Sequence, residues 1–278
     1  MRSARLLRSG VTTVEVKSGY ALTVEGELKM LRAIQTARER GPIDIIPTCL
    51  PAHIVPRDFG GNAMEYVAYL LAEFFPIVQQ EQLAKRADIF VEAEAFGLAE
   101  ARHYLSSLQE RGFDLTVHAD QFSVGGSQVA IDCGAYSADH LEASGEAEIQ
   151  ALAKSDVIPV ALPGASLGLG CGFTPGRRLL DAGASLAIAS DWNPGSAPMG
   201  DLLTSASIFG MAEKLSLAEL LSGITFRGAA ALGLHDRGRL VEGQLADIIA
   251  FEVSDYREIF YQQGQLRPSS VWKRGQLI

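Results

Sequence analysis

Seven short apolar runs alternate with helical segments along the first 190 residues. The runs are almost continuously apolar, as parallel strands buried on both faces should be. They predict strands at residues 11–17, 43–50, 89–91, 115–117, 136–138, 157–162 and 184–190. Strict alternation of such strands with helices is typical of a parallel α/β fold.

Capping residues and glycine or proline stops mark the helices between these strands. Thr23 can cap a helix that presents Leu28, Leu31 and Ile34 on one face. Residues up to Gly10 are predicted to be the end of a helix. Further helices are predicted at about 63–75, 76–85, 98–112, 126–134, 144–154, 177–182, 202–214, 217–221 and 226–234.

The number of strands limits the choice of fold. A closed (β/α)₈ barrel of the TIM type needs eight strands, so we interpret the seven as the second to eighth strands of a barrel that lacks its first. An open doubly wound sheet is the alternative, but no glycine-rich fingerprint follows the first strand. We expect residues 1–235 to form the barrel and residues 236–278, with short glycine-bounded strands, to form part of a small β-sandwich.

Composition favours a small molecule as the partner. The 278 residues carry a net charge of -9 and no run of Lys or Arg, which argues against nucleic acid and anionic membranes. No apolar run is long enough to span a membrane, no secretory signal is evident, and three cysteines without CxxC spacing fit a reducing cytoplasm. Unpaired strands at a gap in the barrel would favour self-association, of which a homodimer is one form.

Polar or ionisable side chains fall at the carboxyl ends of six predicted strands. They are Tyr20, His53, Glu92, His118, His140 and Asp191. In a barrel these ends converge on one face, where catalytic residues lie. The remaining two histidines, His103 on a helix and His235 in a loop, are predicted to be structural.

Histidine and aspartate together are typical ligands of Zn²⁺ or Fe²⁺. His118 and Asp191 are the candidate ligands, although a catalytic zinc normally keeps about three protein ligands and a water. The companions cannot be identified from this sequence. Asp191 also precedes an Asn-Pro-Gly-Ser turn, so a turn-forming role is the alternative.

Six motifs, in this order and spacing, resemble the imidazolonepropionase family of the amidohydrolase superfamily. They are EVKSGYAL, PAHIVP, HADQ, SADHLE, ALPGA and SDWNPGSAP. The resemblance covers the whole chain but only the larger C-terminal part of the family's barrel and sandwich. It implies one zinc or iron ion held by His118, Asp191 and a His-x-His pair on the first strand, and that pair has no counterpart here.

The same resemblance implies roles for the other strand-end residues. Asp191, His140 and Gln121 would be catalytic, with His140 as proton shuttle or oxyanion donor. Substrate-binding residues would be Tyr20, His53, Gln121, Asn193, Gly195 and Ser196. The family's propionate-gripping arginine is absent, and Trp192 and Pro51 depart from the family pattern.

The implied activity is metal-dependent hydrolysis of 4-imidazolone-5-propanoate to N-formimidoyl-L-glutamate in histidine degradation. A related deaminase or cyclic amidase is one alternative, because the metal ligands are shared and only the pocket differs. A truncated, catalytically inactive remnant is the other.

Overall fold

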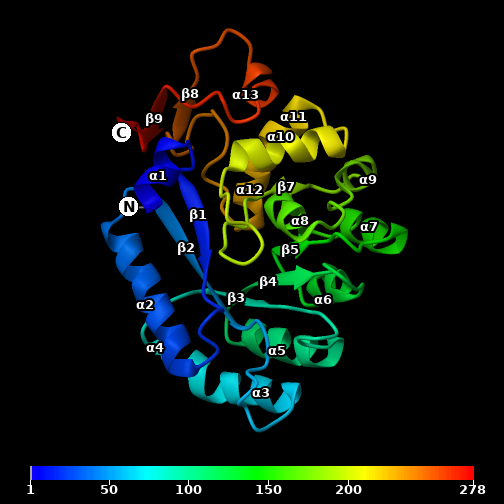
Figure 1. Ribbon diagram of the computed structural model, residues 1–278. Helices are drawn as coiled ribbons and strands as arrows, with labels where there is room; N and C mark the ends of the chain where they lie inside the picture. The colour runs from blue at the N-terminus through cyan, green and yellow to red at the C-terminus, as the bar shows by residue number, and fades with distance from the viewer. Residues whose placement is uncertain (1) are drawn as a thin grey trace.

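The computed structural model describes residues 2–278, so Met1 lies outside the described part. Seven parallel strands form one sheet in chain order (Figure 1). They are β1 (Thr13–Lys17), β2 (Asp44–Ala52), β3 (Arg86–Ile89), β4 (Asp114–Ala119), β5 (Ser137–His140), β6 (Ile158–Ala161) and β7 (Ala187–Ile188). The seven predicted strands and their parallel pairing are confirmed, except that β3 begins at Arg86, three residues before the predicted start at Ile89.

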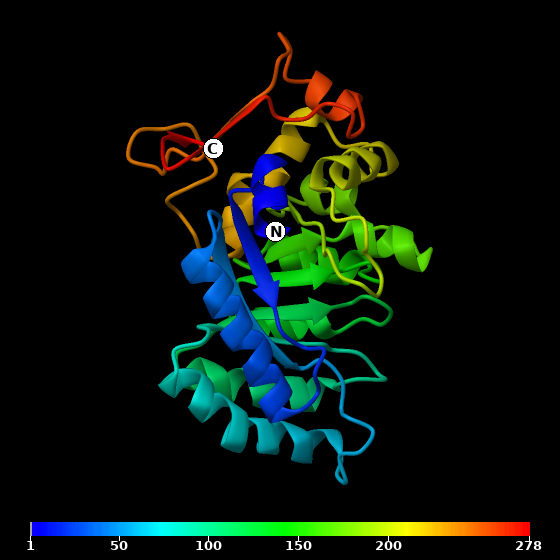
Figure 2. The same ribbon diagram turned by 60° about the vertical axis from the view of Figure 1, so that its left-hand side comes forward.

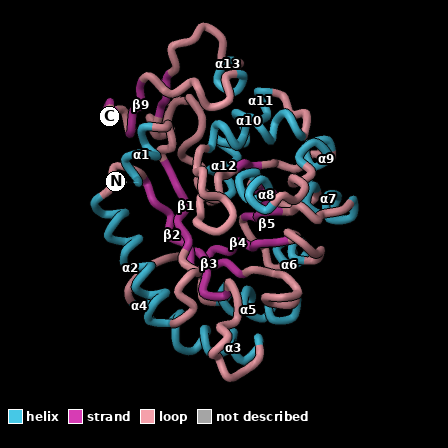
Figure 3. The backbone as a smooth tube through the Cα atoms, viewed as in Figure 1, coloured by secondary structure: helices cyan, strands magenta, loops and turns pink. Residues whose placement is uncertain are grey.

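Helices connect successive strands and cover the outside of the sheet (Figure 3). The N-terminal helix is α1 (Arg2–Arg8). Those between strands are α2 (Val24–Arg40), α3 (Ala63–Tyr69), the π-helical η1 (Leu70–Phe74), α4 (Phe75–Gln80), α5 (Leu98–Glu110), α6 (Gly126–Asp132), α7 (Glu146–Ala153), α8 (Pro163–Leu169) and α9 (Gly176–Asp181). After β7 come α10 (Leu202–Ala212), α11 (Leu217–Ile224), α12 (Phe226–Ala231) and α13 (Glu258–Tyr261).

The sheet is curled like the wall of a barrel, and it is not closed (Figure 2). β1 and β7 are the first and last strands of the order, and within residues 2–278 they do not pair with each other. Because the strands follow chain order throughout, there is no point at which the order reverses. This excludes the doubly wound alternative.

The apolar core lies between the sheet and the helices. Its largest fully buried side chains include Phe74, Phe75 and Tyr104, whose rings pack edge to face around Phe75 at 5.1 and 5.6 Å. The opposite, concave face carries polar side chains instead. Lys17 on β1 contacts Asp139 on β5, so this contact spans the interior of the curve.

Three helical segments differ from the prediction, one of them the short α13 in the segment expected to hold only strands. One helical run covers residues 63–80, because η1 joins α3 to α4, and it ends at Gln80 rather than near residue 85. Pro76 has no N–H with which to continue the helical hydrogen bonds, and it stands just after the π-helical turn η1, where the regular hydrogen-bond pattern is already interrupted. Helix α8 was not predicted, since Pro163 and Gly164 resemble a turn; Pro163 begins the helix instead.

The C-terminal segment adds a three-stranded antiparallel sheet of β8 (Ile248–Ala250), β9 (Ser270–Lys273) and β10 (Gln276–Leu277). It lies beside α1 (Figure 1), and Gly10 approaches Ile249 and Pro268 closely. Lys273 and Arg237 both donate to Asp44 at 2.8 Å, at the start of β2. Among residues 2–278, no helix combines the length and apolarity that crossing a membrane requires.

Candidate functional site

Four of the predicted strand-end residues form a continuous row. Tyr20 packs edge-on against His53 at 5.5 Å between ring centroids, His53 lies 6.4 Å from His118, and His118 lies 5.2 Å from His140. They come from the ends of β1, β2, β4 and β5. The curvature of the sheet therefore gathers side chains that are up to 120 positions apart in the sequence.

His118 stands one residue before the end of β4 and is buried. Its Nδ1 lies 2.8 Å from Oδ2 of Asp88, although the ring N–H does not point along the hydrogen-bond direction. Burial alone would lower the pKa of His118, but the Asp88 carboxylate outweighs it and raises the pKa. With Nδ1 against Asp88, the other ring nitrogen, Nε2, is left to bind a ligand.

Lys17 brings a cation into contact with the same carboxylate. Its Nζ lies 2.6 Å from Asp88, 2.9 Å from Asp139 and 3.4 Å from Glu15. Burial opposes the charged ammonium, yet the carboxylates of Asp139, Asp88 and Glu15 hold the pKa of Lys17 well above its usual value. Burial would likewise raise the pKa of Asp88, but His118 and Lys17 lower it.

The row continues to Tyr20 and His53 at its other end. His53 Nδ1 lies 2.8 Å from the Gly19 carbonyl, and burial lowers the pKa of His53 in spite of that contact. Burial and then the charge of Asp191 raise the pKa of Tyr20. The negative charge of Asp191, which follows β7, thus acts on the phenol at the Tyr20 end of the row.

His140 and the residues around it have an unusual backbone. His140 and Leu141 have φ angles of 84° and 71°, in the left-handed region that L-residues rarely occupy. Thr174 donates through its hydroxyl to the His140 carbonyl and ties this bend to the loop before α9. Backbone strain of this kind clusters at functional sites.

The His140 ring has a carboxylate behind it. Its Nδ1 lies 3.6 Å from Oε2 of Glu142, and both atoms are buried without a hydrogen-bond partner among residues 2–278. The other Glu142 oxygen accepts a hydrogen bond of 2.8 Å from the Ser166 hydroxyl on α8. The unpredicted helix α8 thus fixes the carboxylate beside His140.

The turn after β7 is held by Asn193. Its amide nitrogen donates to the carboxylate of Asp191 at 3.0 Å and lies 3.1 Å from the Ser196 hydroxyl. Its amide oxygen accepts from the backbone N–H groups of Gly195 and Ser196, at 2.8 Å each. Three predicted substrate-binding residues are therefore hydrogen-bonded to one another within the turn.

Glu92 and Asp120 organise the loop that carries Gln121, which is buried. Glu92 accepts hydrogen bonds from the backbone N–H of Phe122 and from the Ser123 hydroxyl. Asp120 accepts from the backbone N–H groups of Gly125 and Ser127 at the start of α6. Both carboxylates thus accept hydrogen bonds from the loop and fix its conformation. The Gln121 side chain makes no hydrogen bond to residues 2–278.

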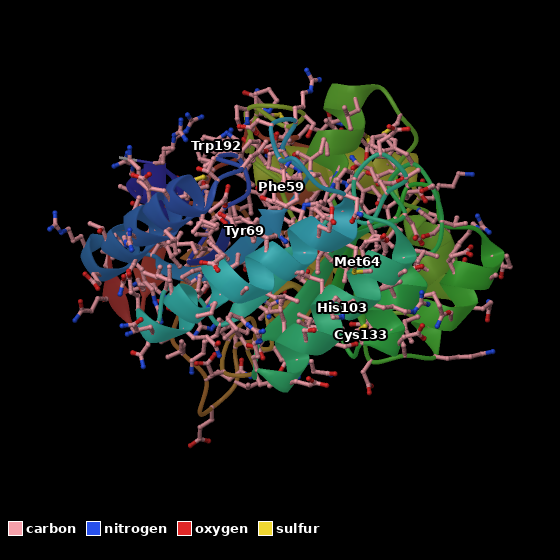
Figure 4. The ribbon with its side chains drawn as sticks, turned by 90° about the horizontal axis from the view of Figure 1, so that it is seen from below. Phe59, Met64, Tyr69, His103, Cys133 and Trp192 are labelled. Atoms are coloured by element: carbon pink, nitrogen blue, oxygen red, sulfur yellow. The ribbon has the colours of Figure 1, made fainter. Side chains whose placement is uncertain are left out.

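The two other histidines lie away from the row. His103 is exposed on the outer side of α5, as Figure 4 shows, and His235 follows α12 in a loop. Trp192 lies on the opposite side of the same view, where it is contacted by Arg2 and Arg5 of α1 at 5.5 and 5.9 Å. A cavity of about 300 Å³ lies between α1 and this loop.

Sequence reasoning found His118 but missed the two carboxylates beside it on the concave face, Asp88 and Asp139. Asp88, His118 and Asp139 offer one ligand atom each within 4.8 Å of one another, and all three are buried. The predicted third strand began at Ile89, so Asp88 was not seen as a strand residue. The available signal was the alternation of polar side chains in the strands, such as Glu15 with Lys17 and Ser137 with Asp139.

The full described chain is similar to one protein family. Residues 2–278 match the model of the amidohydrolase family. The imidazolonepropionase of Deinococcus deserti is 44% identical over 278 residues, which are 99% of this chain and 67% of that protein. The imidazolonepropionase of Bdellovibrio bacteriovorus is 38% identical, and the match covers 65% of that protein. The chain thus spans about two thirds of the length of the curated relatives it matches.

Solved structures show the same fold at low identity. The 5-methylcytosine deaminase from Klebsiella pneumoniae superposes with a TM-score of 0.78 at 18% identity, over all of this chain and 73% of that one. An adenosine deaminase from Xanthomonas campestris with bound zinc gives a TM-score of 0.74 at 19% identity, over 99% of this chain and 67% of that one.

Proposed function

Since the chain belongs to the amidohydrolase family, we propose that it is the larger part of an imidazolonepropionase. This enzyme hydrolyses 4-imidazolone-5-propanoate to N-formimidoyl-L-glutamate, a carbon–nitrogen bond cleavage in a cyclic amidine-like ring. The single observation that carries the proposal is the row of Tyr20, His53, His118 and His140 at one edge of the curled sheet. The identity of 44% with a named imidazolonepropionase supports the choice of substrate over a related deaminase or cyclic amidase.

We propose further that an eighth strand, which residues 2–278 do not supply, pairs between β1 and β7. The support is that the two strands stand at the ends of the sheet without pairing to each other within residues 2–278. That strand would carry the His-x-His pair. The proposed division into a barrel of residues 1–235 and a β-sandwich part of residues 236–278 has support from the separate three-stranded sheet.

The residues present fit a single zinc or iron ion. His118 offers Nε2 because its Nδ1 faces Asp88, and a carboxylate partner on the far nitrogen is the usual arrangement behind a metal-ligating histidine. Asp191 would supply the oxygen ligand. A bound ion of this kind lowers the pKa of a water and polarises a carbonyl group.

The side chains would then divide the work of ring opening. Asp191 would accept the proton of the attacking water. His140 would act through Nε2, either by passing a proton to the departing ring nitrogen or by donating a hydrogen bond to the developing oxyanion. Gln121 lies beside His118 in the sequence motif and would orient the ring. Tyr20 and His53 contact the imidazolone ring, while Asn193, Gly195 and Ser196 border the pocket at the end of β7. The protein would act in the cytoplasm on a small molecule, without nucleic acid or membrane as partner and with a homodimer as the proposed assembly.

The test compares this chain with a longer one that adds an upstream strand carrying a His-x-His pair. The longer chain should bind close to one zinc or iron ion and open the imidazolone ring, while the 278-residue chain should bind the ion weakly and show negligible turnover. Asp191→Asn in the longer chain should abolish turnover. A longer chain that deaminates purines or pyrimidines instead would favour the deaminase, and one without any activity would favour the inactive remnant.

A further inference from the structure

The buried cluster of Asp88, His118 and Asp139 has the composition of a metal site, but a cation already stands in it. The Nζ of Lys17 lies 2.6 Å from Oδ2 of Asp88 and 2.9 Å from Oδ2 of Asp139. Nothing else on the concave face contacts both carboxylates in this way among residues 2–278. The ammonium therefore occupies the position that a metal bridging these two carboxylates would take.

The carboxylate oxygens of Asp88 that would bind a metal already have partners. Oδ2 of Asp88 contacts both Lys17 and Nδ1 of His118, at 2.6 and 2.8 Å. The second oxygen, Oδ1, accepts the backbone N–H of His118 at 3.2 Å. A metal at this cluster would have to displace the lysine, and without displacement it would stand beside a positive charge in a buried environment, where like charges repel strongly.

Glu15 is a third carboxylate beside Lys17, and Arg86 extends the network through Glu15. Glu15 lies 3.4 Å from Lys17 and 3.7 Å from Arg86, and it accepts a hydrogen bond of 2.5 Å from Thr48. Asp139 in turn accepts from the Ser137 hydroxyl at 2.9 Å. Every carboxylate that faces Lys17 thus has a second partner from a neighbouring strand or its own.

We propose that Lys17 is the resident cation of the Asp88–His118–Asp139 cluster and excludes a divalent metal from it, so that Asp88 positions His118 for metal binding through Nε2. The second half of this proposal, that Asp88 positions His118 for metal binding, rests on the proposed metal-dependent function. The first half, that Lys17 excludes a divalent metal from the cluster, concerns only this chain and the free metal. Lys17 and Asp88 are positioning residues here, because neither would touch the substrate.

Titration of the 278-residue chain with Zn²⁺ or Co²⁺ alone tests the first half. Asp139→Asn should leave the metal affinity of the parent chain within about twofold, because Asp139 binds lysine rather than metal. Lys17→Met should raise the affinity for Zn²⁺ at least tenfold by opening the cluster, and Lys17→Met with Asp139→Asn should return it to the parent value. Lys29→Met, at an exposed position on α2, is the matched control and should change nothing.

The folding of Lys17→Met gives a second readout, followed by circular dichroism. If removal of the ammonium unfolds the chain, Zn²⁺ should refold Lys17→Met but not the double variant, because the metal then replaces the lost cation. A tenfold loss of metal affinity in Asp139→Asn alone would overturn the proposal, since the cluster would itself be the metal site. So would a folded Lys17→Met with unchanged affinity, or an unfolded one that zinc does not rescue.

These measurements need no turnover. Failure of the proposed function would appear as a longer chain without ring-opening activity, whereas failure of this inference appears in metal affinity and in folding of the present chain. For the second half, side-chain ¹⁵N spectra of the zinc-loaded longer chain should show His118 metallated at Nε2 and protonated at Nδ1. Metallation at Nδ1 would contradict the positioning by Asp88.

Discussion

The amide of Asn193 donates a hydrogen bond of 3.0 Å to the carboxylate of Asp191, two residues earlier in the same turn. The same nitrogen also donates to the Asp191 carbonyl at 2.7 Å. Asp191 itself has a φ angle of 46°, a left-handed conformation that aspartate adopts when its side chain or a neighbour's bonds locally. Asn193 therefore fixes both the backbone and the carboxylate of the proposed metal ligand.

We expect Asn193→Ala to lower the metal affinity of the longer chain, because the Asp191 carboxylate loses its orienting donor. It should also cost about 1–2 kcal/mol of stability through the lost hydrogen bonds. Urea unfolding and metal titration measure the two effects. Asn62→Ala is the control, because Asn62 caps α3 and should cost about 1 kcal/mol without any change in metal affinity. Reduced turnover with normal metal affinity in Asn193→Ala would favour the substrate contact predicted from sequence.

A second prediction concerns the charge that Asp191 exerts on Tyr20. Burial first and Asp191 second raise the pKa of the Tyr20 phenol. Asp191→Asn removes a negative charge that disfavours the phenolate, so the pKa of Tyr20 should fall toward the ordinary value of about 10. ¹³Cζ NMR titration of the tyrosines measures it. Asp201→Asn is the control: the Asp201 carboxylate is paired with Arg267, and its removal should leave the pKa of Tyr20 unchanged. An unchanged Tyr20 pKa in Asp191→Asn would show that the Asp191 charge does not act on Tyr20.

The apolar pattern carried most of the information about the fold. Seven strands, their parallel order and the capping of α2 by Thr23 follow from local sequence, and the structure confirms them. Helix α8 could not be predicted, because Pro163 and Gly164 suit a turn as well as a helix start. The choice between a turn and a helix start depends on packing against distant residues. Gly164, for example, lies so close to the loop after β7 that a Cβ there would come within 2.8 Å of the Ser190 carbonyl oxygen.

The site was predictable only where it interrupts that pattern. A polar side chain at the end of an apolar run, such as His118 or His140, is visible in the sequence. Lys17 and Asp88 are not, because their partners belong to other strands, which only the pairing and curvature of the folded sheet bring near. From the sequence, Asp139 looks like a functional partner of the adjacent His140. The sequence does not indicate that its carboxylate binds Lys17, which lies 122 residues earlier.

A third prediction concerns the attachment of the C-terminal sheet. Burial would raise the pKa of Asp44, but Lys273, Arg237 and Arg274 lower it. Because the folded-state pKa is below the unfolded value of about 3.9, the contribution of Asp44 to stability is complete above that pH and is lost as pH falls through the folded pKa. Asp44→Asn should therefore cost about 2 kcal/mol at pH 7, and the difference from the parent should shrink below about pH 4.

Thermal unfolding of the parent and Asp44→Asn between pH 3 and pH 7 measures this difference. Asp132→Asn is the control, because its ion pair with Arg102 is exposed and exposed pairs contribute about 0–1 kcal/mol. A constant difference across the whole range would mean that the loss comes from packing and not from charge.

The last prediction concerns the carboxylate behind His140. Nδ1 of His140 and Oε2 of Glu142 are 3.6 Å apart, and neither has a hydrogen-bond partner among the described residues. A small movement of either side chain would join them, and the resulting contact would fix the ring so that Nε2 faces the other histidines of the row. Ser166 holds the opposite oxygen of Glu142 at 2.8 Å and limits the freedom of the carboxylate.

In the longer chain, we expect Glu142→Gln to lower kcat about 10- to 100-fold, the range typical of a residue that orients a functional histidine. KM should change little, because Glu142 would not touch the substrate. Ser166→Ala should have a smaller effect on kcat, since the carboxylate remains beside His140 while one hydrogen bond is lost. Steady-state kinetics of the two variants, with unfolding curves to exclude a general loss of structure, measure the difference. An equal loss in both variants would mean that α8 acts by packing, and a change confined to KM would place Glu142 in the substrate pocket.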